Sequence, residues 1–340
     1  MTSPMSPSID AAGAAGPVFL VGMNGSGTTM LCHSLGNHPD LYGCKRETRV
    51  LPHFIAHLHR YGNLGDDDNF LRLMRDIYAL RAFRQLNGGR PVPLAEDWAT
   101  MPRDLASIVD TAFRYFAVKE HKKRWADKTP MHALHITALA RLFPSARFVH
   151  VIRDGRDSAA SFHRRWHRTP DVTIHRWKTV VREARRQGTG VGDRYFELRY
   201  EDLTREPEVW MERVCTFLGL PFCAAVLQSR QPWMAAAKKS QAAGIVRNSG
   251  NWRTYFEAGT IADLESIAGS TLAACGYDTA RPASDRDPPK VVRLGWMIRD
   301  YLSQGTHDLR AMAKRRDFGG IAELRQRARD AFRQLWTMKY

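Results

Sequence analysis

The stretch Pro17–Thr29, PVFLVGMNGSGTT, decides the fold of this chain. It opens with a short apolar run, PVFLVGM, which is the pattern of a buried β-strand. The small residues Gly25–Gly27 follow, and apolar residues recur with helical spacing over 28–35. A strand, a glycine-rich loop and a helix in this order are typical of a phosphate-binding corner, because the loop N–H groups converge there and the helix dipole attracts an anion.

The spacing of residues in this loop indicates which phosphate groups it can bind. Gly22 and Gly27 match the G-x-x-x-x-G frame of P-loop proteins. The next residue is Thr28, whereas ATPases and GTPases have a lysine there that reaches the β- and γ-phosphates. The loop can therefore hold a phosphate but lacks the usual γ-phosphate clamp. An ordinary tight turn between a strand and a helix is the alternative.

The rest of the chain repeats the alternation of strand and helix. Strands are predicted at Trp125–Lys128, Ala146–Ile152 and Tyr195–Tyr200, and helices over 68–86, 130–143, 156–165 and 206–218. This order predicts an α/β fold with a P-loop-type parallel sheet flanked by helices. We expect a disordered leader at 1–16, a single α/β domain at 17–285 and a basic helical C-terminal extension at 286–340.

The composition limits the kinds of binding partner and the cellular compartment that we expect for this protein. The 340 residues carry a formal net charge of +16, which attracts anions such as nucleotides, nucleic acid or acidic lipids. The chain has no apolar run of about 18 residues and no signal-peptide pattern at its start. Its five cysteines form no C-x-x-C pair, so we expect reduced thiols and a cytoplasmic protein. No His or Cys spacing suits a metal ion, so none is expected.

A second anion site is predicted beside the first. Arg153 follows an apolar strand, and ligands of open parallel sheets bind at the carboxyl ends of strands. Ser161 and Arg165 lie four residues apart on the next helix and share one face. Two separated anion sites without a P-loop lysine suggest a nucleotide such as 3′-phosphoadenosine 5′-phosphosulfate (PAPS). The alternative is an ordinary helix with exposed arginines.

Several motifs resemble known enzymes. The run VFLVGMNGSGTTML resembles the 5′-phosphosulfate loop of PAPS-dependent sulfotransferases, and FVHVIRDGRDSAASFHRRW resembles their 3′-phosphate motif. NHPDLYGCKRETRVLP, DKTP, RLFPSARF, ELRYEDL and FLGLPF are similar to tyrosylprotein sulfotransferases in particular. The resemblance covers about Val18 to Tyr277 and implies that the domain at 17–285 is a sulfotransferase domain.

The resemblance also implies residue roles. Glu47 stands where the family places its catalytic base, and Lys128 where it places the lysine that meets the sulfate and the bridging oxygen. The implied cofactor-binding residues are Gly25, Ser26, Gly27, Thr28 and Thr29 at the 5′-phosphate, Arg153, Ser161 and Arg165 at the 3′-phosphate, and Tyr200, Ser240, Arg247 and Trp252 around the nucleotide. Without the resemblance, Glu47 would be read as a salt-bridge partner of Arg46 or Arg49.

One position departs from the family. Gly25 replaces the Arg or Lys that usually precedes Ser-Gly-Thr and helps to neutralise the transferred sulfate. Arg46, Arg49 and Lys128 are the candidates to take over that charge, and the sequence does not choose among them.

The expected reaction is sulfuryl transfer from PAPS to a hydroxyl acceptor by in-line displacement, which leaves 3′,5′-adenosine bisphosphate. The acceptor stays open among a tyrosine or other phenol, a glycan, a lipid and a small molecule, and segment 53–119 is expected to shape its pocket. Alternatives are a P-loop nucleotide kinase or NTPase, which Thr28 disfavours, and a non-catalytic anion-binding protein.

The remaining expectations concern partners and charged segments. Asp66–Asp68 is read as a helix cap rather than the metal site of a glycosyltransferase. The basic tail is a solvated helical face or a peripheral contact with an acidic surface. No nucleic-acid partner is expected, and a homodimer stays open.

Overall fold

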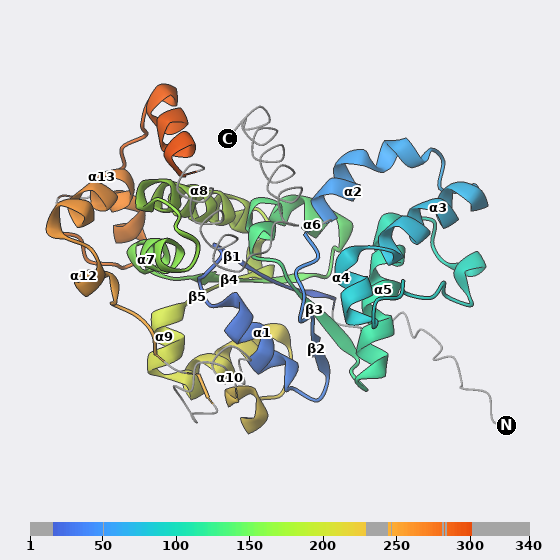
Figure 1. The fold of residues 1–340 in the computed structure, drawn as a ribbon. Coiled ribbons are helices and arrows are strands. Elements are labelled where there is room, and N and C mark those ends of the chain that lie inside the picture. The colour runs from blue at the N-terminus through green and yellow to red at the C-terminus, as the bar shows by residue number, and fades with distance from the viewer. Residues whose placement is uncertain are drawn as a thin grey trace, which may run out of the picture. The chain divides into compact units, whose positions relative to one another are not determined.

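The computed structural model describes residues 16–49, 51–228, 244–245, 247–280, 282 and 284–300. Within them the chain forms a five-stranded sheet in the order β2-β3-β1-β4-β5 (Figure 1). The strands are β1 (Val18–Gly22), β2 (Leu41–Gly43), β3 (Arg124–Lys128), β4 (Arg147–Ile152) and β5 (Tyr195–Arg199). Every neighbouring pair is parallel, which confirms the predicted α/β fold with a parallel sheet.

The described chain forms two compact units. The first comprises Met1–Arg153 and Thr179–Ser249, and the second comprises Asp154–Lys178 and Gly250–Tyr340. The sheet belongs to the first unit. Most of the predicted leader, 1–15, and most of the predicted extension, 301–340, lie outside the described residues.

Both faces of the sheet are buried at its centre, which explains why β1 is apolar throughout rather than alternating. On one face, Val18 and Leu20 join a hydrophobic cluster with α1 (Thr28–Gly36), α9 (Tyr200–Arg205) and α10 (Pro207–Leu218), and these helices lie together in Figure 1. On the other face, Phe19 contacts the rings of Trp125, Phe143 and Phe148. The strands therefore sit in a core on both sides.

Several helices of the first unit differ from the predictions. The predicted helix over 68–86 is two helices, α3 (Asp67–Tyr78) and α4 (Arg81–Leu86), because Leu80 has an extended backbone with ψ 142°. The predicted helix over 130–143 is a 3₁₀ turn, η3 (Pro130–Leu134), followed by α6 (Ile136–Leu142), because His135 leaves helical φ/ψ.

Other helices of the first unit were not predicted. These are α2 (Leu51–His57), η1 (Leu58–Tyr61), η2 (Trp98–Thr100), α5 (Leu105–Lys119), the part of α8 (Pro170–Thr189) from residue 179 on, η4 (Gly192–Arg194), α9 (Tyr200–Arg205) and η5 (Ala224–Leu227).

The acidic run at 66–68 caps a helix, as expected. The Asp66 side chain accepts a hydrogen bond from the Asn69 backbone N–H at 3.1 Å and so caps α3. Among the described residues, no group of three or more His, Cys, Asp or Glu side chains could hold a metal ion. Nor does that part of the chain contain a helix long and apolar enough to cross a bilayer.

The second unit is helical. It holds α7 (Gly155–Trp166), the first part of α8 (Pro170–Thr189), α12 (Trp252–Tyr255), α13 (Ala258–Ala274) and a helical stretch at 290–300. The Asp157 carboxylate joins two of these segments, because it accepts hydrogen bonds from the backbone N–H groups of Gly250 and Trp252 at 2.6 and 3.1 Å.

Candidate active site

The central candidate residues lie at the carboxyl ends of three neighbouring strands. The glycine loop follows β1, Lys128 ends β3 and Arg153 follows β4, and β1 lies between the other two. Because the three strands are parallel, their carboxyl ends meet at one edge of the sheet. Ligands of open α/β sheets bind at this edge where the strand order reverses, as it does around β1.

The loop after β1 has a backbone that only glycine adopts easily. Gly25 and Gly27 have φ values of 85° and 105°, in the left-handed region. At Gly27 a Cβ atom would also lie 2.5 Å from Cδ2 of Tyr200, so there is no room for a side chain. Gly25 replaces the usual Arg or Lys, and glycine adopts a positive φ more easily than either of them.

This loop has polar groups available for an anion. Ser26 is buried, and its hydroxyl has no hydrogen-bond partner among the described residues. Gly27, the N-cap of α1, supplies no side-chain cap to the N–H groups of the first turn, which includes Thr28 and Thr29. A buried unsatisfied hydroxyl costs about 1–3 kcal/mol, so a bound phosphate oxygen would relieve it. These features fit the 5′-phosphate of PAPS.

Arg153 and Tyr200 lie against the same loop. Arg153 Nη1 donates a hydrogen bond to the Gly25 carbonyl oxygen at 3.2 Å, and Nη2 donates to the Asn248 carbonyl oxygen. The Arg153 guanidinium carbon lies 4.8 Å from the centre of the Tyr200 ring. The structure therefore brings together four of the residues predicted to bind the cofactor, namely Gly25, Gly27, Arg153 and Tyr200.

The other residues predicted to hold the nucleotide are distributed over the chain. Ser161 is half-buried and Arg165 is exposed on α7, in the second unit, whereas Arg153 belongs to the first. Arg247 is exposed in the first unit, and its Nε donates to Ser249 Oγ at 3.3 Å. Ser240 lies outside the described residues.

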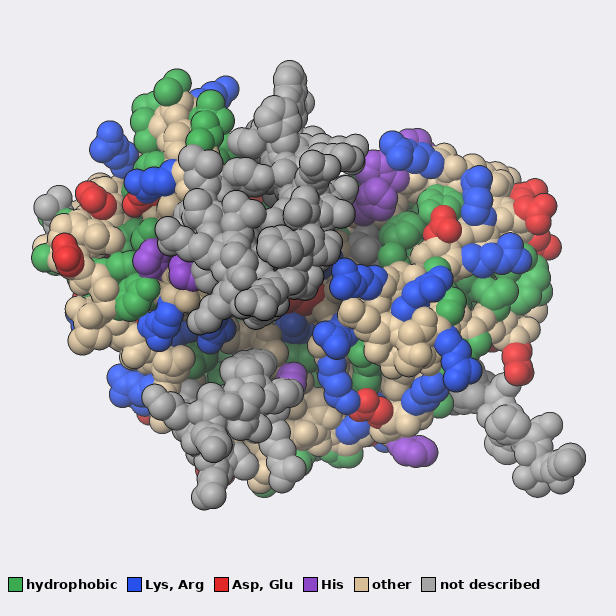
Figure 2. All heavy atoms as spheres, viewed as in Figure 1, with side chains coloured by type: hydrophobic (Ala, Val, Ile, Leu, Met, Phe, Trp, Pro, Cys, Tyr) green, Lys and Arg blue, Asp and Glu red, His purple; other side chains and the backbone are tan. Residues whose placement is uncertain are grey.

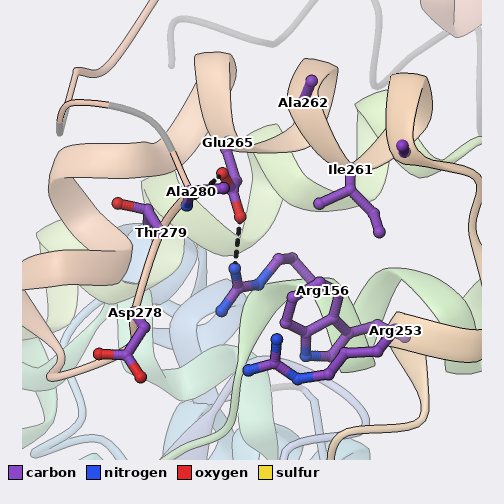
Figure 3. Close-up of a pocket in the computed structure, with 10 residues that line it drawn as sticks. Arg156, Arg253, Ile261, Ala262, Glu265, Asp278, Thr279 and Ala280 are labelled. Atoms are coloured by element: carbon purple, nitrogen blue, oxygen red, sulfur yellow. Dashed lines mark hydrogen bonds and ion pairs between the residues drawn. The ribbon is translucent and has the colours of Figure 1, made fainter.

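Trp252 lies in the second unit, beside a cavity of about 520 Å³ lined by α12, α13 and residues 278–280 (Figure 3). Its ring is stacked between two guanidinium groups, with the Arg156 carbon at 3.8 Å and the Arg253 carbon at 4.3 Å from the ring centre. Arg156 Nη1 also donates to Glu265 at 2.6 Å. Burial by itself would lower the pKa of Arg156, but its bonds to Asp154 and Glu265 outweigh burial and raise it. Arg156 is thus paired with Asp154 and Glu265 beside this cavity while its guanidinium packs on the Trp252 ring.

Glu47 and Lys128 form the central ion pair of the first unit. Lys128 is only 5% exposed, and its Nζ lies 3.3 Å from Glu47 Oε1. Arg49 Nε donates to the other carboxylate oxygen, Oε2, at 2.7 Å. The structure thus brings together two residues that the sequence separates by 81 positions. It also contains the Arg49 salt bridge that was the alternative role for Glu47.

A buried hydrogen-bond network holds these two residues in place. Asp127 is fully buried and accepts from Thr48 Oγ1 at 3.1 Å and from Thr129 Oγ1 at 3.2 Å. Thr129 Oγ1 in turn accepts from the Thr48 backbone N–H at 3.0 Å, and His132 Nδ1 lies 3.1 Å from Asp127 Oδ2. We call Thr48, Asp127 and Thr129 the clamp. Its members flank Glu47 and Lys128 in the sequence, so it ties the two segments together.

The clamp was missed by sequence reasoning. Asp127 and Thr129 stand inside the DKTP motif, which drew attention only to its lysine. In a strand, successive side chains point to opposite sides. The Asp127 side chain, which precedes Lys128 in β3, therefore points away from that of Lys128. That alternation was the signal that could have identified them.

Comparisons with known proteins show that this chain is similar to sulfotransferases. The chain is 26% identical over 227 residues to protein-tyrosine sulfotransferase 1 of Danio rerio, covering 63% of this chain and 56% of that protein. It is 25% identical over 297 residues to protein-tyrosine sulfotransferase of Drosophila melanogaster, covering 80% and 54%. The chain therefore spans about half the length of these relatives.

A mycobacterial relative and a solved structure extend the comparison. The omega-hydroxy-beta-dihydromenaquinone-9 sulfotransferase Stf3 of Mycobacterium tuberculosis is 28% identical over 249 residues, covering 60% of this chain and 63% of that protein. The sulfotransferase domain of the Synechococcus PCC 7002 olefin synthase shares the fold, with a TM-score of 0.50, 23% identity and coverage of 77% and 95%. Residues 17–224, more than half of the chain, match the sulfotransferase family. The chain therefore belongs to the sulfotransferase family, which confirms the family that the sequence motifs resemble.

Proposed function

We propose that this chain transfers a sulfuryl group from PAPS to a hydroxyl acceptor, with Glu47 as the general base and Lys128 as the cation at the leaving oxygen. The observation that carries the proposal is the 3.3 Å contact between Lys128 Nζ and Glu47 Oε1 at the carboxyl end of β3. It supports these roles because β3 pairs directly with the strand that leads into the glycine loop. PAPS, when bound, supplies the activated sulfuryl group and leaves as 3′,5′-adenosine bisphosphate.

The two charged groups have complementary tasks. Arg49 and Lys128 flank the Glu47 side chain, and a carboxylate can accept the proton of an acceptor hydroxyl. Lys128 is buried, so its ammonium acts in a medium of low dielectric, where charge stabilisation is strong. We assign to Lys128 the charge that the usual P-loop cation would provide, because Gly25 cannot.

The cofactor-binding part of the proposal rests on the glycine loop. Its N–H groups and the Ser26 hydroxyl would hold the 5′-phosphate, with Arg153 and Tyr200 beside them. For the 3′-phosphate, Ser161 and Arg165 remain candidates from the sequence alone.

The favoured acceptor is the phenolic hydroxyl of a tyrosine. Support comes from the relatives that are named protein-tyrosine sulfotransferases. A phenol, with a pKa near about 10, also needs less help from a carboxylate base than an aliphatic alcohol. A hydroxylated lipid is the second candidate, because the Stf3 relative is named for one.

We propose a cytoplasmic location. All five cysteines are free thiols in the structure, which is the usual state in a reducing compartment.

Transfer of labelled sulfate from PAPS to tyrosine peptides and to a hydroxylated isoprenoid lipid tests the proposal. We expect Glu47→Gln to lower kcat by about 10²–10⁴-fold and Lys128→Ala by about 10²–10³-fold, because each loses a group that acts in the transition state. Glu120→Gln and Lys123→Ala make the same substitutions at exposed residues near β3 in the sequence and serve as matched controls.

Calorimetry with 3′,5′-adenosine bisphosphate, 5′-AMP and ATP separates binding from chemistry. Both active-site variants should still bind the bisphosphate within about threefold of the unsubstituted chain. Wild-type turnover in either variant would contradict the assigned roles, and a preference for ATP would instead support the kinase alternative.

A further inference from the structure

The helical stretch at 290–300 is fixed to the second unit through one face. The Asp300 carboxylate accepts a hydrogen bond from the Thr169 backbone N–H at 2.7 Å and pairs with Arg168 at 3.0 Å. The Trp296 ring lies 6.3 Å from that of His175, and Arg299 pairs with Asp171. All of these partners lie within residues 168–175, so this face of the stretch is anchored on the start of α8.

The other face of the same stretch is apolar and exposed. Val291, Leu294 and Ile298 are 79%, 46% and 50% exposed. Their spacing of i, i+3 and i+7 places them along one side of a helix, away from Trp296 and Asp300. We call these three residues the apolar face. In Figure 2 hydrophobic side chains with Lys and Arg beside them cover this helix, at the upper left of the view.

Cations lie beside the apolar face in this stretch and follow it in the sequence. Lys290 and Arg299 lie at its two edges by helical spacing, and Arg293 belongs to the same stretch, but Arg299 is already paired with Asp171. The sequence that follows, 301–340, contains nine Lys and Arg against four Asp and Glu, and the whole chain has a net charge of +16. An apolar stripe edged by cations is the pattern of a helix that lies in the interface of a membrane.

We propose that the apolar face docks this protein on an anionic membrane surface. The three side chains would enter the boundary between headgroups and acyl chains while Lys290, at the edge of the face, meets lipid phosphates. Each cation near such a surface contributes about 1 kcal/mol, and the apolar area adds to this. Charge also argues against a second copy as the occupant, because two copies would bring their cationic edges together. The inference does not depend on the proposed reaction.

Co-sedimentation of the full chain with vesicles tests this surface. We expect binding to vesicles of phosphatidylcholine with phosphatidylglycerol, much weaker binding to phosphatidylcholine alone, and weakening by salt. Leu294→Asp combined with Ile298→Asp should reduce the bound fraction at least about tenfold, because two apolar side chains lose their burial. The matched control is Val118→Asp with Val209→Asp, two similarly exposed valines elsewhere, which should bind like the unsubstituted chain.

Three results would overturn the proposal. They are no binding to the anionic vesicles, equal binding of the Leu294/Ile298 variant, and a dimer in light scattering that the same substitutions dissociate. If the Asp variant unfolds, as judged by its melting temperature, Leu294→Ser with Ile298→Ser gives the same comparison with a smaller perturbation.

Discussion

At the residue scale, Gly27 carries two constraints that can be separated. Its φ of 105° is strained for any other residue, and a Cβ atom would meet the Tyr200 ring at 2.5 Å. We expect Gly27→Ala to lower the affinity for 3′,5′-adenosine bisphosphate at least about tenfold, because the loop must shift away from its anion-binding shape.

Gly88→Ala is the control for this prediction. Gly88 also has a positive φ, 63°, but a Cβ atom there would meet nothing within 4 Å. Calorimetric titration of both variants isolates the collision with Tyr200, and equal affinities would show that the close approach is unimportant.

The clamp leads to a second prediction at this scale. Thr48→Val keeps the shape of the side chain but removes the hydroxyl that donates to Asp127. A hydrogen bond to a charged group contributes about 1.5–3 kcal/mol, and its loss should let the Glu47 segment move. We expect kcat to fall about tenfold or more, with little change in nucleotide affinity and with a shifted pH profile of kcat as Glu47 changes its surroundings.

Thr100→Val is the matched control, because Thr100 is exposed and its hydroxyl bonds only locally, to the Asp97 carbonyl oxygen. A Thr48→Val enzyme with lower stability but an unchanged pH profile would assign the clamp a purely structural role.

At the scale of elements, a polar network joins β4, β5 and α8 within the first unit. His150 Nδ1 lies 2.6 Å from the Tyr195 hydroxyl, which donates to Glu197, and Arg185 Nη2 donates to Glu197 at 2.8 Å. Burial alone would raise the pKa of Glu197, but bonds from His150 and Arg185 outweigh burial and lower the pKa to about 2.

Because of this network, the free energy of unfolding should decrease as the pH falls. The pKa of Glu197 is lower in the folded chain than its ordinary value of 4.5, so its contribution is present above about pH 4.5 and is lost as pH falls toward 2. Glu197→Gln should flatten the decline of urea-unfolding free energy between these pH values. Glu183→Gln, at a carboxylate on α8 that pairs with the exposed Arg186, is the comparison and should change the slope less. If the unfolding free energy of Glu197→Gln declined with falling pH as steeply as that of the unsubstituted chain, the role assigned to Glu197 would be contradicted.

The same scale shows where sequence periodicity worked and where it did not. The strands β1, β4 and β5 were predicted because each is a short apolar or alternating run between turns. The helix over 68–86 was predicted as continuous because its apolar spacing continues past the break at Leu80, which the backbone makes without a Gly or Pro signal. Periodicity reports which side chains are buried, and it does not report a change of direction between two helices that bury the same face.

At the scale of the whole molecule, the candidate site is assembled from distant segments. Lys128 and Glu47 meet across 81 positions, and Arg153 reaches Gly25 across 128. The resemblance to sulfotransferases named these residues one by one, but only the parallel sheet explains why they can act together. Adjacent parallel strands place their carboxyl ends at one edge, whatever their separation in the chain.

The sequence by itself determined the fold class and the glycine loop, because these depend on local patterns of apolar and small side chains, and its resemblance to sulfotransferases supplied the candidates Glu47 and Lys128. Only the tertiary structure decided that Thr48, Asp127 and Thr129 clamp the Glu47 and Lys128 segments together, that Tyr200 excludes a side chain at Gly27, and that Val291, Leu294 and Ile298 are exposed. The physical reason is that hydrogen-bond partners and burial depend on which segments pack together, and local spacing does not encode those contacts.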